Sequence, residues 1–272
     1  MTDGCPDHLS VSQISMLMRC PMQYEWRYIK GVKAPYPVAL AQGNAMHRVL
    51  QSVNSYFMLK KKWLKEADVA DIWRTVWGET QKEVEDWGEE SQESVLVSGL
   101  DLLRTYLREV ADETVPVACE EFFDVKINGE SVIGYIDLVE KDSVSDYKVV
   151  GRTPSQKDVE NHMQLALYCI VKQVKLGQII ALNKKKQEVT VIPAKFNCKE
   201  WLGWFGDIID RYAAMRKAGV FPPCQPDSWM CSEKFCGYYK QCRGASSKKK
   251  GVRIQYVQIG GVGPRKAEVE DE

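Results

Sequence analysis

The sequence predicts an α/β protein in which helices flank a mixed central β-sheet and also form an N-terminal layer. Apolar residues recur at helical spacing through much of residues 8–112, and the period changes to two from Val115 onward. A helical stretch at 155–176 then separates three consecutive strand-like segments from two later ones. Helices, a three-stranded meander, one helix and further strands, in this order, indicate a mixed sheet.

The N-terminal region is expected to contain several helices. A first helical stretch over 8–30 is capped near Ser10 or Ser12 and is interrupted at Cys20-Pro21. A second helix begins near Gly43 and continues to about residue 61. Residues 66–112 are amphipathic and are expected to be helical as well.

The sheet is expected to have five strands. The candidates are CEEFFDVKI (119–127), VIGYIDLVE (132–140), SVSDYKVV (143–150), QIIALN (178–183) and EVTVIPAKF (188–196). The Asn128-Gly129 pair between the first two is a strong signal for a β-hairpin turn. A last helix is expected from Lys199 to about Lys217.

A single domain is expected over residues 1–244. Within it we expect a helical part at about 8–112, a catalytic sheet core at about 115–217 and a cysteine-rich segment at 224–242. Residues 245–272 are polar and Gly-rich with an acidic end, which predicts a flexible tail.

The composition limits the possible partners and compartments. Lys+Arg and Asp+Glu each total 37, so any nucleic-acid site must be a local basic patch. The candidates for such contacts are Lys60–Lys62, Arg152, Lys157, Lys184–Lys186 and Lys248–Lys250. No signal peptide or membrane span is evident, and the nine cysteines suggest a metal in a reducing cytoplasm rather than disulfides.

Two predicted strands carry charged residues among apolar neighbours. Asp146 and Lys148 share one strand face, and a hairpin register that pairs Asp137 near them would place all three together. Two adjacent carboxylates repel each other unless a proton or a cation intervenes, and Mg²⁺ or Mn²⁺ suits oxygen ligands. A lysine beside such an ion can orient or activate water, or stabilise charge on a phosphoryl group. The alternative is an exposed strand face with an incidental salt bridge.

The ordered motifs resemble those of the PD-(D/E)XK nuclease superfamily, specifically its RecB-like branch of CRISPR-associated and phage exonucleases. GYID at 134–137 and DYK at 146–148 resemble the catalytic core. GNAMH at 43–47 resembles the G-x-x-x-H helix, and QLALY at 164–168 resembles the Q-x-x-x-Y helix. Glu120 stands where that family has an acidic residue on the first core strand. The resemblance implies a restriction-endonuclease-like core.

The resemblance also implies roles for individual residues. The expected metal ligands are His47, Glu120, Asp137, Asp146 and the carbonyl of Tyr147. Lys148 would position or activate the attacking water, and Gln164 with Tyr168 would steady Lys148 and touch the DNA backbone. Glu121 competes with Glu120, because strand alternation allows only one of them to face the site. His162 is expected at the surface.

Three cysteines cluster near the C-terminus, at 231, 236 and 242, without a zinc-type C-x-x-C pair. In the RecB-like branch, one cysteine ahead of the histidine helix and three after the core bind an iron–sulfur cluster. The resemblance therefore implies a structural 4Fe-4S cluster held by Cys20, Cys231, Cys236 and Cys242. The family spacing has two residues where this chain has four, so zinc or no metal stays open, and Cys224 is a rival ligand.

The sequence thus predicts a metal-dependent DNA nuclease, with exonuclease action on duplex ends or single strands implied by the resemblance. Recombination, repair or phage DNA metabolism would be its setting, with unknown partner proteins. The alternative is a non-catalytic DNA-binding or adaptor protein with an iron–sulfur or zinc site. An RNA substrate is a third reading.

Overall fold

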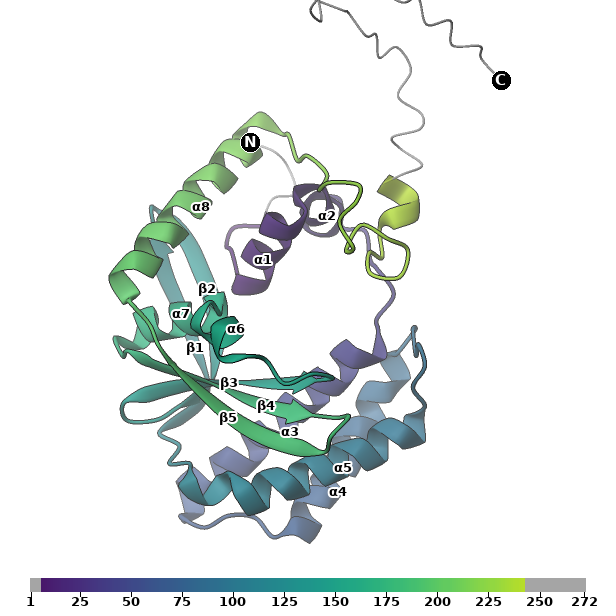
Figure 1. Ribbon diagram of the computed structural model, residues 1–272, viewed down its shortest axis with the longest axis vertical. Coiled ribbons are helices and arrows are strands. Elements are labelled where there is room, and N and C mark those ends of the chain that lie inside the picture. The colour runs from purple at the N-terminus through teal and green to yellow at the C-terminus, as the bar shows by residue number, and fades with distance from the viewer. Residues whose placement is uncertain (1–5, 243–272) are drawn as a thin grey trace, which may run out of the picture. The chain divides into compact units, whose positions relative to one another are not determined.

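The computed structural model describes residues 6–242 (Figure 1). The chain divides into two units, Met1–Pro226 and Asp227–Glu272. The predicted tail at 245–272, including Lys248–Lys250, lies outside the described residues.

Helices dominate the first half of the larger unit. They are α1 (Val11–Arg19), α2 (Pro21–Tyr24), α3 (Val38–Lys60), α4 (Glu66–Thr80) and α5 (Gln92–Glu109), with a short π-helix at Glu25–Ile29 and short 3₁₀ helices at Gln81–Glu83 and Ala111–Glu113. The Ser10 hydroxyl accepts from the backbone N–H of Gln13 and so caps α1. Proline at the first position of α2 marks the predicted interruption. The second predicted helix begins five residues earlier than Gly43, after Pro37.

Five strands form one sheet in the order β1-β2-β3-β4-β5. Their bounds are β1 (Ala118–Ile127), β2 (Glu130–Val139), β3 (Ser143–Val150), β4 (Leu176–Asn183) and β5 (Glu188–Lys195). Strands β3 and β4 pair in parallel and the other neighbours pair antiparallel, so the predicted mixed-sheet α/β class is confirmed. Asn128 and Gly129 both have positive φ, as the predicted tight hairpin requires.

Three further helices complete the unit: α6 (Gln156–Glu160), α7 (Met163–Lys172) and α8 (Cys198–Ala218). The single helix predicted at 155–176 is therefore two, because the His162 side chain caps a new helix by accepting from the N–H of Leu165. Helix α7 ends at Lys172, and the following residue, Gln173, takes a left-handed backbone.

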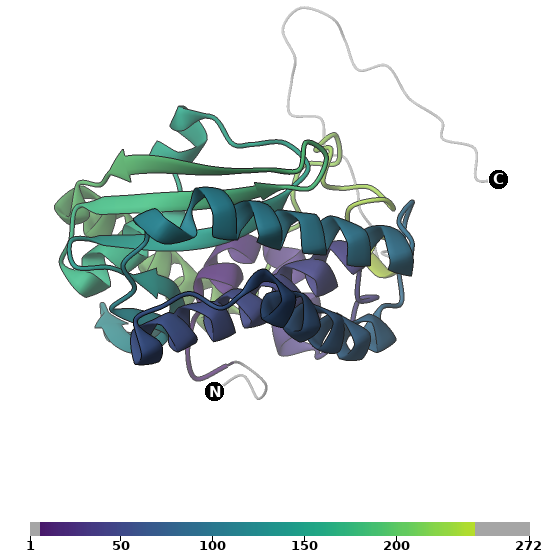
Figure 2. The same ribbon diagram turned by 90° about the horizontal axis from the view of Figure 1, so that it is seen from below.

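Two hydrophobic cores cover the two faces of the sheet. One core packs α1, α7 and α8 against the sheet through residues such as Leu17, Leu167 and Phe205. The other packs α3, α4 and α5 against the opposite face, with Trp73 and Trp77 fully buried. Figure 2 shows α5 running alongside the teal and green strands, and α4 packs on α3 and α5. Among the described residues, none of the helices has the length and apolar character needed to cross a membrane.

Candidate active site

The register of the β2–β3 hairpin brings two aspartates together. Leu138 pairs with Ser145 and Val139 with Val144, so the next position sets Asp137 beside Asp146. The backbone N–H of Tyr147 donates to Asp137 Oδ2 at 2.9 Å. Asp137 is 6% exposed and Asp146 is fully buried, which is unusual for carboxylates. The alternative interpretation of this motif, an exposed strand face with an incidental salt bridge, is therefore excluded.

Asp146 lacks the hydrogen bonds that a buried carboxylate normally has. Neither of its oxygens has a hydrogen-bond partner within residues 6–242. Lys148 Nζ lies 3.0 Å from Asp146 Oδ2 and forms an ion pair with it, so Oδ1 is the oxygen without a partner among these residues. A buried carboxylate oxygen without a partner is costly, and a bound cation would satisfy it.

A chain of hydrogen bonds holds Lys148. Its ammonium donates to Gln164 Oε1 at 3.0 Å, and Gln164 Nε2 donates to the Tyr168 hydroxyl at 2.6 Å. The Tyr168 hydroxyl in turn donates to the carbonyl of Tyr135 at 2.5 Å. Burial lowers the pKa of Lys148, but the Asp146 and Asp137 carboxylates together outweigh burial and the net pKa is raised. Lys148 is therefore an oriented cation at neutral pH.

His47 approaches the carboxylates from α3. Its Nε2 donates to the carbonyl of Tyr147 at 2.8 Å, because a carbonyl can only accept. Its Nδ1 lies 3.4 Å from Asp137 Oδ2 and 3.8 Å from Glu120 Oε1. His47, Glu120 and Asp137 thus bring three potential metal-ligand atoms within 4.8 Å of one another.

The backbone selects Glu120 over Glu121. Cys119 pairs with Leu138 and Glu121 with Ile136, so Glu120 lies opposite Asp137. Glu120 has φ of 47°, which is uncommon for a residue other than glycine and concentrates at functional sites. Its carboxylate faces His47, whereas that of Glu121 pairs with Lys172 of α7 at 2.9 Å.

The electrostatics of the site favour an added positive charge. Burial and then the neighbouring Asp146 raise the pKa of Asp137 to about 7, although His47 and Lys148 oppose that shift. Burial would lower the pKa of His47, but Glu120, Asp137 and Asp146 together raise it. Oxygen donors and one imidazole around unsatisfied buried carboxylates fit a hard divalent ion, and the imidazole favours Mn²⁺.

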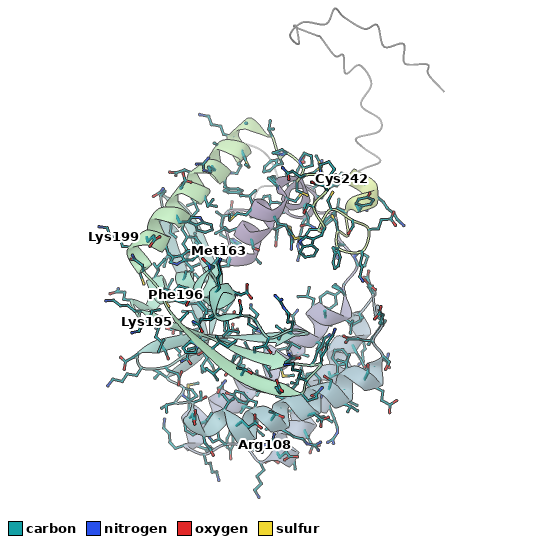
Figure 3. The ribbon with its side chains drawn as sticks, viewed as in Figure 1. Arg108, Met163, Lys195, Phe196, Lys199 and Cys242 are labelled. Atoms are coloured by element: carbon teal, nitrogen blue, oxygen red, sulfur yellow. The ribbon has the colours of Figure 1, made fainter. Side chains whose placement is uncertain are left out.

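The site opens into a cavity of about 520 Å³ beside Lys148. Its lining includes Tyr135, Gln164, Tyr168 and Met163, the last of which is labelled on α7 in Figure 3. His162, expected at the surface, is half-buried and also lines the cavity. Its Nδ1 accepts from Leu165, so Nε2 carries the hydrogen in the neutral ring, and burial lowers its pKa.

The sequence did not indicate which side chains hold Tyr147 in place. The buried Tyr147 hydroxyl accepts from Asn54 at 3.0 Å and bonds the Tyr106 hydroxyl at 3.0 Å. Burial raises the pKa of Tyr106 to about 12. These bonds fix Tyr147, whose backbone binds both His47 and Asp137. No local pattern marks Asn54 or Tyr106, since both look like ordinary helical residues.

The cysteines fall in both units. Within the larger unit, Cys20 Sγ accepts from the backbone N–H of Cys224 at 3.4 Å, and Met22 N–H donates to the Pro222 carbonyl. Cys231, Cys236 and Cys242 belong to the smaller unit. The four-cysteine cluster therefore stays a prediction.

Comparison with known proteins identifies the family. The sequence matches the PD-(D/E)XK nuclease superfamily over residues 8–243. A crystal structure described as "Putative exonuclease" from Eubacterium rectale is similar, with 15% identity, a TM-score of 0.56, and coverage of 92% of this chain and 91% of that one. A second crystal structure, of SSO0001, has 12% identity, covers 86% of this chain and 84% of that one, and has a TM-score of only 0.38. No curated protein matches the sequence. The match over residues 8–243 shows that this chain belongs to the PD-(D/E)XK nuclease superfamily.

Proposed function

We propose that this chain is a divalent-metal-dependent DNA exonuclease of the RecB-like branch, acting on duplex ends or single strands. Recombination, repair or phage DNA metabolism in the cytoplasm would be its setting. The observation that carries the proposal is the pair of buried carboxylates, Asp137 and Asp146, with the Lys148 ammonium 3.0 Å from Asp146. The fold similarity to a protein described as "Putative exonuclease" gives additional support for the exonuclease reading.

Five residues would hold Mg²⁺ or Mn²⁺. They are His47, Glu120, Asp137, Asp146 and Tyr147, the last through its carbonyl. His47 and the Tyr147 carbonyl are hydrogen-bonded to each other, so joint ligation through Nε2 and the carbonyl would break that bond. Nδ1 already faces Asp137 and Glu120 and needs no such change. When bound, the ion would polarise the phosphoryl group and acidify a water molecule.

Side chains of the protein would orient the attacking water and stabilise the charge on the phosphoryl group. Lys148, kept charged by Asp146, would orient the attacking water and stabilise negative charge on the phosphoryl oxygens. Gln164 and Tyr168 would hold the ammonium in place through the hydrogen-bond chain that ends on Tyr135.

A structural 4Fe-4S cluster, held by Cys20, Cys231, Cys236 and Cys242, is part of the proposal. Cys20 Sγ accepts a hydrogen bond from the backbone N–H of Cys224, and hydrogen bonds of this type stabilise a cluster thiolate. Anaerobically purified protein should be brown and contain iron and sulfide, and both should be lost in Cys20→Ser. Zinc in place of iron, or neither, would remove the cluster from the proposal.

The decisive experiment is hydrolysis of end-labelled linear DNA with Mn²⁺ or with EDTA. Wild type should degrade DNA only with Mn²⁺, and Asp146→Ala should not. Asp142→Ala is a matched control, because Asp142 lies exposed in the adjacent turn. A ladder from one end supports exonuclease action, and internal fragments refute it.

The alternative, a non-catalytic DNA-binding or adaptor protein with an iron–sulfur or zinc site, predicts binding without hydrolysis in the same assay. A matched RNA strand in parallel lanes tests the RNA substrate.

A further inference from the structure

An exposed aromatic pair lies on the β1–β2 hairpin. Phe122 and Tyr135 are direct cross-strand partners, and their ring centroids are 5.3 Å apart. They are 54% and 55% exposed, whereas the adjacent Phe123 and Ile136 are buried in the core. Outward positions of a half-buried sheet are normally polar, as the exposed Asp124 and Lys126 are. Packing within the chain therefore does not account for these two rings.

The pair lies next to the catalytic groups. Phe122 follows Glu120 by two residues and Tyr135 precedes Asp137 by two, which is roughly 7 Å along each strand. Tyr135 and Lys148 line the same cavity. The Tyr135 carbonyl also ends the hydrogen-bond chain that holds Lys148. A phosphodiester held between Asp137 and Lys148 would thus place the adjoining nucleotide close to the β1–β2 hairpin that carries the two rings.

We propose that Phe122 and Tyr135 form a stacking platform for an unpaired nucleobase next to the scissile phosphate. This inference rests on the proposed nuclease function and specifies its substrate as a single-stranded segment, because both faces of a base within duplex DNA are already stacked. Aromatic stacking accepts any base, which suits a nuclease without sequence readout. Two rings bounded by Asp124 and Lys126 are too small a patch for a stable protein partner.

The test compares two oligonucleotides of equal charge, an oligothymidylate and a chain of the same length whose sugars carry no base. In EDTA, wild type should bind the oligothymidylate about 5- to 150-fold more tightly, the range expected for one stacked base. Phe122→Leu/Tyr135→Leu should bind both equally, whereas Tyr135→Phe should keep the preference. Leu59→Ala removes another exposed apolar side chain and is the control.

A second readout reports stacking directly. The fluorescence of 2-aminopurine in the oligonucleotide should fall when wild type binds, and should not fall with the double variant. Thermal denaturation of each variant verifies that the hairpin stays folded.

The outcomes separate the two proposals. If wild type hydrolyses DNA with Mn²⁺ but the folded double variant retains the base preference, the platform is wrong and the nuclease function stands. If wild type neither binds nor hydrolyses DNA, both proposals are wrong.

Discussion

Replacing Asp137 by asparagine should stabilise the metal-free protein while removing its response to metal. The pKa of Asp137 is raised from 3.8 to about 7 by burial and by Asp146. A shift of that size corresponds to about 4 kcal/mol of unfavourable free energy once the carboxylate is ionised in the folded state. Asparagine keeps an oxygen for the Tyr147 N–H, so we expect it to regain roughly 2–4 kcal/mol.

The effect should depend on pH in a defined direction. The folded-state pKa lies above the unfolded one, so the folded protein holds more protons between these values and the Asp137 contribution lowers stability as pH rises. The advantage of Asp137→Asn should therefore be small near pH 4, grow until about pH 7, and stay constant above it.

Thermal denaturation in EDTA at several pH values, repeated with Mn²⁺, measures both effects. At pH 8 in EDTA the variant should melt roughly 5–15 °C above wild type, and Mn²⁺ should raise the melting temperature of wild type only. Asp142→Asn is the control, because that exposed aspartate is in the turn next to the site. If Asp137→Asn melts below wild type in EDTA at pH 8, the argument from buried carboxylate repulsion is refuted.

Three further predictions follow from the structure. Lys148→Met should lower the DNA hydrolysis rate by about 100-fold or more. It should keep the Mn²⁺-induced rise in melting temperature, because Lys148 is not a proposed metal ligand. Loss of that rise would contradict the proposal that Lys148 acts on water and phosphate rather than on the metal. Tyr147→Phe loses the hydroxyl bonded to Asn54 and Tyr106 and should cost about 1–3 kcal/mol in urea denaturation, and an unchanged midpoint would show that this anchor is unimportant. Gly99→Ala should destabilise the protein by about 1–3 kcal/mol, because the new Cβ would lie 2.0 Å from the Trp73 ring. Gly203→Ala in α8 has open space around the new Cβ and should not destabilise the protein. Equal melting temperatures of the two variants would refute the packing argument.

The sequence alone determined the features that depend on local chemistry. Strand periodicity located all five strands, and the Asn128-Gly129 pair located the hairpin because its turn requires positive φ. Asp146 and Lys148 share a face because side chains alternate along a strand. The ordered motifs also indicated the family, which the match over residues 8–243 shows independently.

Only the tertiary structure decided which groups meet across long separations in the chain. His47 reaches the Tyr147 carbonyl one hundred residues away because α3 packs over the sheet, and no local pattern specifies that contact. The choice of Glu120 depends on a left-handed backbone that β-strand alternation does not predict. His162 enters the cavity because it caps α7. The Tyr147 hydroxyl is fixed by the Asn54 amide of α3 and the Tyr106 hydroxyl of α5. Periodicity reports which face of an element is apolar, but packing between elements decides which polar groups on those faces come together.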